Sequence, residues 1–155
     1  NENEKYFPLP EPTPIKIMKV NYPSKSNKVG NIKITEAYFE SPSTTDYNGL
    51  FDGKYIDFEA KETINPKGFP LSNIHKHQIN HIRNIHNEKG VCFLIIRFTK
   101  LNQTYLLMAK DFLEYLDDNP KSIMPIEYIN NHGYLIKDKF IPRVDYLEII
   151  DKIKE

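Results

Sequence analysis

The heptapeptide YIDFEAK at residues 55–61 is the part of this sequence that decides the fold. Its apolar and polar residues alternate with the period of a β-strand, in which successive side chains point to opposite faces of the sheet. One face carries the apolar side chains Ile56, Phe58 and Ala60. The other carries the polar side chains Tyr55, Asp57, Glu59 and Lys61. We therefore predict a strand in which the Glu59 carboxylate and the Lys61 ammonium group project side by side.

A hairpin is predicted just before this strand, because an Asp-Gly pair at residues 52–53 separates the runs 49–51 and 54–61. The hairpin can return Asp46 to a position beside Glu59. Two neighbouring carboxylates repel each other and favour a divalent cation with oxygen ligands, such as Mg²⁺. An adjacent ammonium group such as Lys61 can orient a water and stabilise charge on a phosphate. The pattern is typical of metal-dependent phosphodiester hydrolysis, although spacing alone also allows a solvated face with a surface salt bridge.

The remaining elements predict one α/β domain over residues 1–155. Further strands are expected at 15–20, 32–39, 91–98 and 104–108, and the apolar run 91–98 indicates burial on both faces of a sheet. Helices are expected at 75–88, 110–116 and 146–153. Residues 65–70 are expected to form a loop, and residues 121–143 to be irregular.

The charge distribution is uneven, although 21 basic and 21 acidic residues give no net charge. Residues 12–35 carry five lysines and no acid, and residues 64–110 carry seven basic residues and one acid. The segment between them carries seven acids and two lysines. This order suits a polyanion-binding protein with an embedded metal site, or simply an uneven surface.

Other features exclude several classes of protein. The longest apolar run has six residues, whereas a membrane span needs about 20. The single cysteine, Cys92, excludes an internal disulfide and is typical of a reducing cytoplasm. His77 and His81 are one helical turn apart, but no further ligand nearby completes a zinc site. Since the chain begins without Met, we expect an N-terminal segment to be missing or disordered.

A series of motifs extends over nearly the whole chain, from about residue 12 to 150. The main ones are STTDYNG (43–49), YIDFEAKET (55–63), FPL (69–71), HQ (77–78) and IIRF (95–98). PTPI (12–15), YPS (22–24), EAYF (36–39), TYLL (104–107) and HGY (132–134) fit in the same order. Together these motifs strongly resemble RecU, the Holliday junction resolvase family of low-GC Gram-positive bacteria and their relatives.

The resemblance implies a restriction-endonuclease-like fold, with a mixed sheet flanked by helices and a projecting stalk. It implies a homodimer that cuts two opposed strands of a four-way DNA junction with Mg²⁺, for which Mn²⁺ is a possible substitute. The family's metal-site positions fall on Thr44, Asp46, Glu59 and Gln78. Its transition-state-stabilising lysine falls on Lys61. Asp46, Glu59 and Lys61 are therefore the expected catalytic residues.

The resemblance also places the stalk at about residues 22–34, where Lys25, Lys28 and Lys33 would contact phosphates. The family's N-terminal basic segment, and a helix with an acidic residue near the active site, have no counterpart in residues 1–11. A RecA-type recombinase is a possible partner. The alternatives are a non-cutting accessory that binds branched DNA and modulates the recombinase, and an endonuclease specific for a duplex sequence.

Overall fold

The computed structural model of the chain describes residues 9–10, 15–21, 33–39, 45–118, 122–137 and 145–153. The chain divides into two compact units, one made of Asn1–Pro10 with Thr45–Glu155 and the other of Glu11–Thr44. The larger unit contains a mixed α/β fold, as the order of the predicted elements indicates, and the smaller unit contains a two-stranded sheet.

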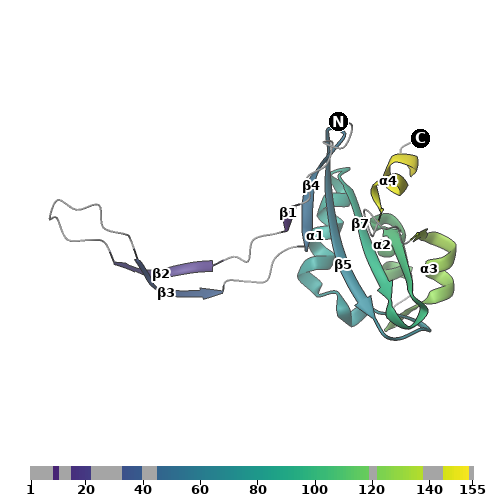
Figure 1. Ribbon diagram of the computed structural model, residues 1–155, viewed down its shortest axis with the longest axis horizontal. Coiled ribbons are helices and arrows are strands. Elements are labelled where there is room, and N and C mark those ends of the chain that lie inside the picture. The colour runs from purple at the N-terminus through teal and green to yellow at the C-terminus, as the bar shows by residue number, and fades with distance from the viewer. Residues whose placement is uncertain are drawn as a thin grey trace. The chain divides into compact units, whose positions relative to one another are not determined.

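A six-stranded sheet forms the centre of the larger unit, in the order β1-β4-β5-β7-β8-β10 among the described residues (Figure 1). The strands are Leu9–Pro10, Tyr47–Phe51, Lys54–Thr63, Val91–Phe98, Gln103–Met108 and Tyr134–Ile136. Neighbouring strands are antiparallel except for β5 and β7, which run parallel. A parallel pair requires a crossover connection, and the segment that contains helix α1 provides it.

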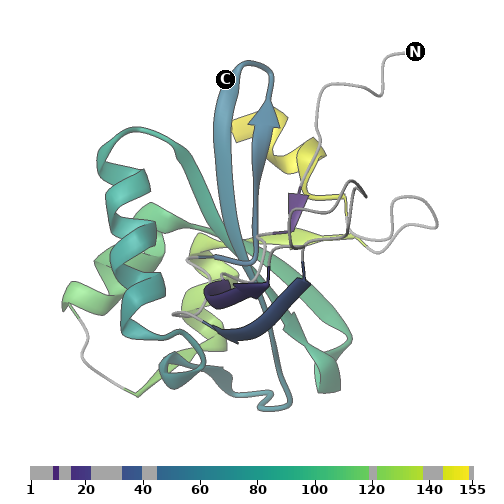
Figure 2. The ribbon, with the colours of Figure 1, turned by 90° about the vertical axis from the view of Figure 1, so that its left-hand side faces the viewer.

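Four α-helices accompany the sheet in the described part of the chain. They are α1 (Lys76–Asn87), α2 (Ala109–Asp118), α3 (Ile126–His132) and α4 (Leu147–Ile153). α1, α2 and α3 pack on the face that carries Leu94 and Ile96 of β7. α4 packs on the face that carries Phe93 and Ile95, so β7 is buried on both faces as its apolar run predicts. Figure 2 shows α1 and α4 on opposite sides of β5.

The predicted hairpin is confirmed by the antiparallel pairing of β4 with β5, in which Phe51 is opposite Lys54. Asp52 and Gly53 form its two-residue turn with φ angles of 49° and 73°. Positive φ at both central residues is what a hairpin turn matched to the strand twist requires, and Asp-Gly adopts it at low cost. The turn therefore sets the register that brings the start of β4 to the middle of β5.

The smaller unit pairs β2 (Ile15–Asn21) with β3 (Lys33–Phe39) in an antiparallel sheet. Both strands were expected from their alternation, and the observed bounds differ by a single residue from those predicted. The register shifts on either side of Lys19, which is where the alternation of apolar and lysine residues breaks down. An irregular pairing at this point is the expected consequence, because an extra residue reverses the faces of those that follow.

Two expectations for the connecting segments are wrong. The expected loop at 65–70 contains β6 (Gly68–Pro70), which pairs with β9 (Ile123–Pro125) in the segment expected to be irregular. That segment also contains α3 and β10. Elements of three to seven residues are too short to show a period, and their existence depends on partners far away in the sequence.

No helix in the described ranges is both long and apolar enough to cross a membrane. Cys92 is buried in β7, and burial raises the pKa of its thiol far above the ordinary range. Cys92 is therefore a small core side chain and not a reactive nucleophile, as expected for a cysteine in a strand buried on both faces.

The core can be tested with two isoleucines that differ in burial. Ile82 of α1 is fully buried, whereas Ile64 is 71% exposed. Ile82→Ala should lower the free energy of unfolding by about 2–5 kcal/mol, because it removes packing and leaves a cavity. Ile64→Ala should change it by less than ~0.5 kcal/mol. Urea unfolding of both variants measures this, and equal losses would contradict the packing of α1 on the sheet.

Candidate active site

The candidate site lies on the polar face of β5, where α1 covers the strand (Figure 1). Asp57 and Glu59 are completely buried there, two residues apart on the same face as the alternation predicts. α1 contributes the buried Gln78, while its apolar side chains pack against β7 next to it. Buried carboxylates are costly unless donors satisfy them, so the contacts of this face define its chemistry.

Asp46 forms two hydrogen bonds that cross from the start of β4 to β5, one with Glu59 and one with Ala60. The Asp46 amide donates to Glu59 Oε2 at 3.2 Å, and the Ala60 amide donates to Asp46 Oδ2 at 3.0 Å. Regular pairing of the two strands begins at Tyr47, opposite Phe58. Just beyond the paired residues of β4 and β5, the Asp46 carboxylate thus accepts the hydrogen bond that a backbone carbonyl would otherwise accept from the Ala60 amide. This bond orients the carboxylate towards the site.

Lys61 follows Glu59 by two residues on β5 and lies between the two carboxylates. Its Nζ forms a close ion pair with Glu59 Oε1 and lies 3.9 Å from Asp46 Oδ2. The Glu59 side chain is fully buried, whereas those of Lys61 and Asp46 are 23% and 38% exposed. The Glu59 carboxylate therefore lies at the buried side of the cluster, and the Asp46 carboxylate and the Lys61 ammonium group lie at its solvent-facing side.

The electrostatics of Glu59 reflect this burial. Removal of its carboxylate from water raises its pKa above the ordinary value of 4.5, and the neighbouring Asp46 carboxylate raises it further. The hydrogen bond and charge of Lys61 act in the opposite direction without cancelling the effect. A second positive charge placed between the two carboxylates would favour their ionised forms.

Gln78 is held by two contacts that determine how its amide is oriented. Its Oε1 accepts a hydrogen bond from the His75 amide at 3.0 Å, which completes a capping box at the start of α1. Its Nε2 donates to Glu59 Oε1 at 2.6 Å. The reverse orientation would set the amide oxygen against a carboxylate, so the observed one is required. The second lone pair of Oε1 is then the only part of Gln78 that can act as an oxygen ligand.

The structure thus brings together Asp46, Glu59, Lys61 and Gln78 of the expected site. Thr44, Lys25 and Lys28 lie outside the described residues, and Lys33 is described only as part of the backbone of β3. The described residues contain no cluster of three or more His, Cys, Asp or Glu groups arranged to hold a metal. Two carboxylates suit Mg²⁺, which binds through one or two such groups and keeps several waters.

The zinc alternative finds no support in the contacts of the two histidines. His81 Nε2 lies 2.9 Å from Asp57 Oδ2, and the ring of His77 stacks on that of His75. No third ligand joins them in the described part of the chain.

Sequence reasoning missed the role of Asp57. Its carboxylate accepts hydrogen bonds from Thr45 at 2.6 Å and from Tyr55 at 2.8 Å, in addition to the contact with His81. The alternation of β5 places Asp57 on the site's face, which was the only available signal. Thr45 and His81 lie 12 and 24 residues away from Asp57, on segments that only the folded chain brings together.

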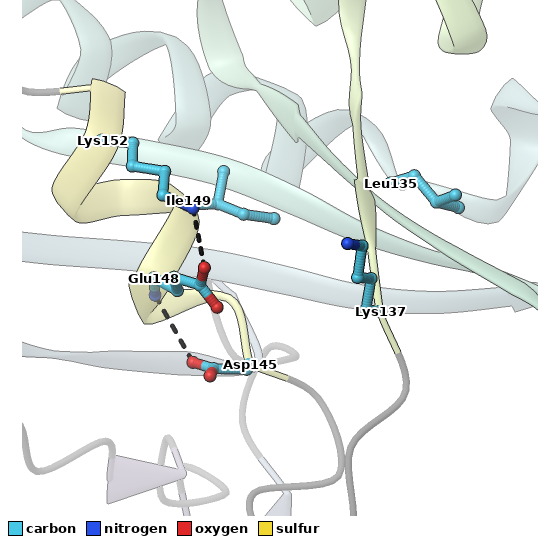
Figure 3. A pocket seen from close by; sticks show the side chains of 6 residues that line it. All are labelled: Leu135, Lys137, Asp145, Glu148, Ile149 and Lys152. Carbon is cyan, nitrogen blue, oxygen red and sulfur yellow. Dashed lines mark hydrogen bonds and ion pairs between the residues drawn. The ribbon is translucent and has the colours of Figure 1, made fainter.

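A separate pocket of about 130 Å³ lies between α4 and the residues at the end of β10 (Figure 3). Its lining residues are Leu135, Lys137, Asp145, Glu148, Ile149 and Lys152. Glu148 forms an ion pair with Lys152 at 2.7 Å, and its amide donates to Asp145. The pocket shares no residue with the cluster on β5, and its charges are mixed, so it is not a second acidic site.

Comparison with known proteins gives one consistent result. Residues 9–152 match the model of the family described as Recombination protein U. A protein named Holliday junction resolvase RecU from Oceanobacillus iheyensis is 50% identical over 146 residues, which cover 92% of this chain and 72% of that protein. A protein of the same name from Staphylococcus aureus is 48% identical, and the match covers 92% of this chain and 68% of that protein.

The raised pKa of Glu59 predicts how stability depends on pH in the absence of divalent cations. Between the ordinary value of 4.5 and the raised pKa, the folded chain binds more protons at this group than the unfolded chain does. The contribution of Glu59 to the free energy of unfolding is therefore fully present below pH 4.5 and is lost as the pH rises through the raised pKa. Glu59→Gln, which cannot titrate, should gain stability relative to the parent over that range.

Urea unfolding in the presence of a chelator, at a series of pH values, measures this difference. Glu114→Gln is the matched control, because its side chain is 57% exposed on α2. It should follow the parent at each pH. A Glu59→Gln variant whose stability runs parallel to the parent across the range would contradict the prediction.

Proposed function

Because the chain belongs to the RecU family of Holliday junction resolvases, we propose that Asp46, Glu59 and Lys61 form the catalytic centre with which it cuts four-way DNA junctions. The protein is an endonuclease of DNA recombination and repair. We also propose for it the restriction-endonuclease-like form of the mixed α/β fold. The mixed sheet supports this, with its central parallel pair β5 and β7 and helices on both faces.

The observation that carries the site assignment is the completely buried Glu59 carboxylate, held next to both Asp46 and Lys61. A protein interior rarely keeps such an acid unless it is paired, and this one has its pKa raised despite its pairing with Lys61. Perturbed groups of this kind collect at functional sites. The alternative interpretation of the Glu59 and Lys61 spacing, a solvated strand face with a surface salt bridge, would have left Glu59 exposed.

The residues of the cluster fit a divalent metal ion, for which we propose Mg²⁺ with Mn²⁺ as a substitute. The available donors are hard oxygens, which Mg²⁺ prefers. The carboxylates of Asp46 and Glu59 both approach a cation already, the ammonium group of Lys61. Asp46 and Glu59 would hold the ion, and Thr44 and Gln78 would complete its surroundings. When bound, such an ion lowers the pKa of a water and neutralises charge on the scissile phosphate.

Lys61 has the position and charge for two tasks in phosphodiester hydrolysis. Its partly exposed ammonium group can donate a hydrogen bond to the attacking water and so orient it in line with the phosphorus. It can also offset the negative charge that grows on the phosphate oxygens, which is stabilisation specific to the transition state. Glu59 holds Lys61 in place through their ion pair. We propose that cleavage leaves a 5′ phosphate, which is what the restriction-endonuclease-like fold implies.

We propose that residues 22–34 form a stalk that enters the junction, with Lys25, Lys28 and Lys33 on its phosphates. Contacts of this kind position a substrate and make its affinity depend on salt, without reading its sequence. A homodimer would place two equivalent sites on opposed strands, as two symmetric cuts require. A RecA-type recombinase as partner and a cytoplasmic location remain predictions from the sequence.

The first test compares a labelled synthetic four-way junction with a linear duplex of the same sequence, each with and without Mg²⁺. Symmetric nicks that need the metal and occur in the junction alone are the expected result. Cleavage of the duplex would indicate an endonuclease specific for a duplex sequence. Junction binding without cleavage would indicate the recombination accessory instead, and either result would overturn the proposal.

The second test removes in turn the proposed metal ligand Glu59 and the proposed transition-state-stabilising group Lys61. Glu59→Ala and Lys61→Ala should each abolish cleavage, while junction binding measured in a chelator stays within about twofold of the parent. Glu114→Ala and Lys110→Ala are controls of equal charge change, since this pair is exposed on α2. They should cleave like the parent. Metal-dependent cleavage that survives in either site variant would refute the assignment.

A further inference from the structure

Asp57 is a fully buried carboxylate that has no part in the catalytic cluster just described. Thr45 Oγ1 donates to its Oδ1 at 2.6 Å, and Tyr55 donates to its Oδ2 at 2.8 Å. His81 Nε2 lies 2.9 Å from the same Oδ2. This contact joins the imidazole of α1 to the buried carboxylate of β5. Both oxygens of Asp57 are thus committed to protein donors rather than directed at a ligand.

The partners of Asp57 come from the segments that carry the catalytic cluster. Thr45 directly precedes Asp46, and it is completely buried. His81 lies one helical turn after Gln78 on α1. Asp57 itself precedes Glu59 by two residues on β5. One buried group therefore ties the start of β4 and the helix α1 to the strand that carries Glu59 and Lys61.

This arrangement bears on the distance between the two acidic groups. The backbone at Asp46 is bent, and Tyr47 is the first residue of β4 that pairs with β5. Outside the regular ladder, the position of Asp46 depends on the contacts of its own neighbourhood. The hydrogen bond from Thr45 Oγ1 to Asp57 Oδ1, at 2.6 Å, is a buried side-chain contact directly next to Asp46.

We propose that Asp57 is a positioning residue, which holds Thr45 and His81 so that Asp46 and Gln78 converge on Glu59. The inference rests on the proposed function, because it concerns the geometry of the same metal site. Groups that orient metal ligands without touching the metal are typically worth 10- to 100-fold in metal affinity or activity. Asp57 acts through its partners and does not touch the scissile phosphate.

The test uses two substitutions at Thr45 that separate its hydroxyl from its methyl group. Thr45→Val keeps the shape and removes the donor, whereas Thr45→Ser keeps the donor and removes the methyl group. Thr45→Val should lower the cleavage rate at saturating junction by 10- to 100-fold, and Thr45→Ser should retain most of the rate. Without DNA, Thr45→Val should bind Mn²⁺ at least 10-fold more weakly, measured by the loss of the free Mn²⁺ signal in electron paramagnetic resonance.

Substitutions of His81 on α1 test the same proposal, so that a folding defect caused by a change at Thr45 does not decide the outcome. His81→Gln keeps a donor towards Asp57, and His81→Leu removes it. The Leu variant should lose more of the rate and more of the Mn²⁺ affinity than the Gln variant. His86→Leu, an exposed change on the same helix, should leave both at the parent's values. Junction binding in a chelator should be unchanged in all these variants.

The proposal is wrong if Thr45→Val and His81→Leu keep the parent's rate and Mn²⁺ affinity. It is also wrong if Thr45→Ser loses as much as Thr45→Val in step with its melting temperature, since that would show a packing role only. A parent protein that binds the junction without cutting it would instead overturn the proposed function. In that case Mn²⁺ affinity still tests the positioning role by itself.

Discussion

The burial of the Glu59 carboxylate on a central strand is the constraint on which the rest of the site depends. A buried anion requires donors from every side that water would otherwise supply. Here they come from the Asp46 amide, the Gln78 side chain and Lys61. Each donor belongs to an element whose position is then limited, so one charged group organises the start of β4, the first turn of α1 and β5 itself.

Helix α1 has two tasks that its sequence combines without conflict. Its apolar residues, such as Ile82, pack on β7 and close the core on that face of the sheet. Its polar residues Gln78 and His81 point to the two buried acids of β5. The Gln78 amide also caps the helix, so the bond that begins the helix and the bond that reaches the site share one side chain. Local helix stability and site geometry are therefore linked.

Most of the architecture could be predicted from the sequence, because its long elements have clear periods. The alternation of β5, the Asp-Gly turn and the apolar run of β7 were enough to predict an α/β domain and to place Glu59 and Lys61 on one face. The short elements β6, β9, α3 and β10 were missed, since a strand of three residues exists only through its partner. Neither local propensity nor period can show such a partner.

The sequence by itself determined which acids and lysine share a strand face, since alternation is a property of the backbone, and its motifs determined the family. Only the tertiary structure decided that Glu59 is buried, that the Gln78 amide donates to it, and that Asp57 joins Thr45 to His81. The physical reason is that periodicity describes one element at a time. Burial and hydrogen-bond partners depend on which elements meet, and those contacts span separations of 12 to 24 residues here.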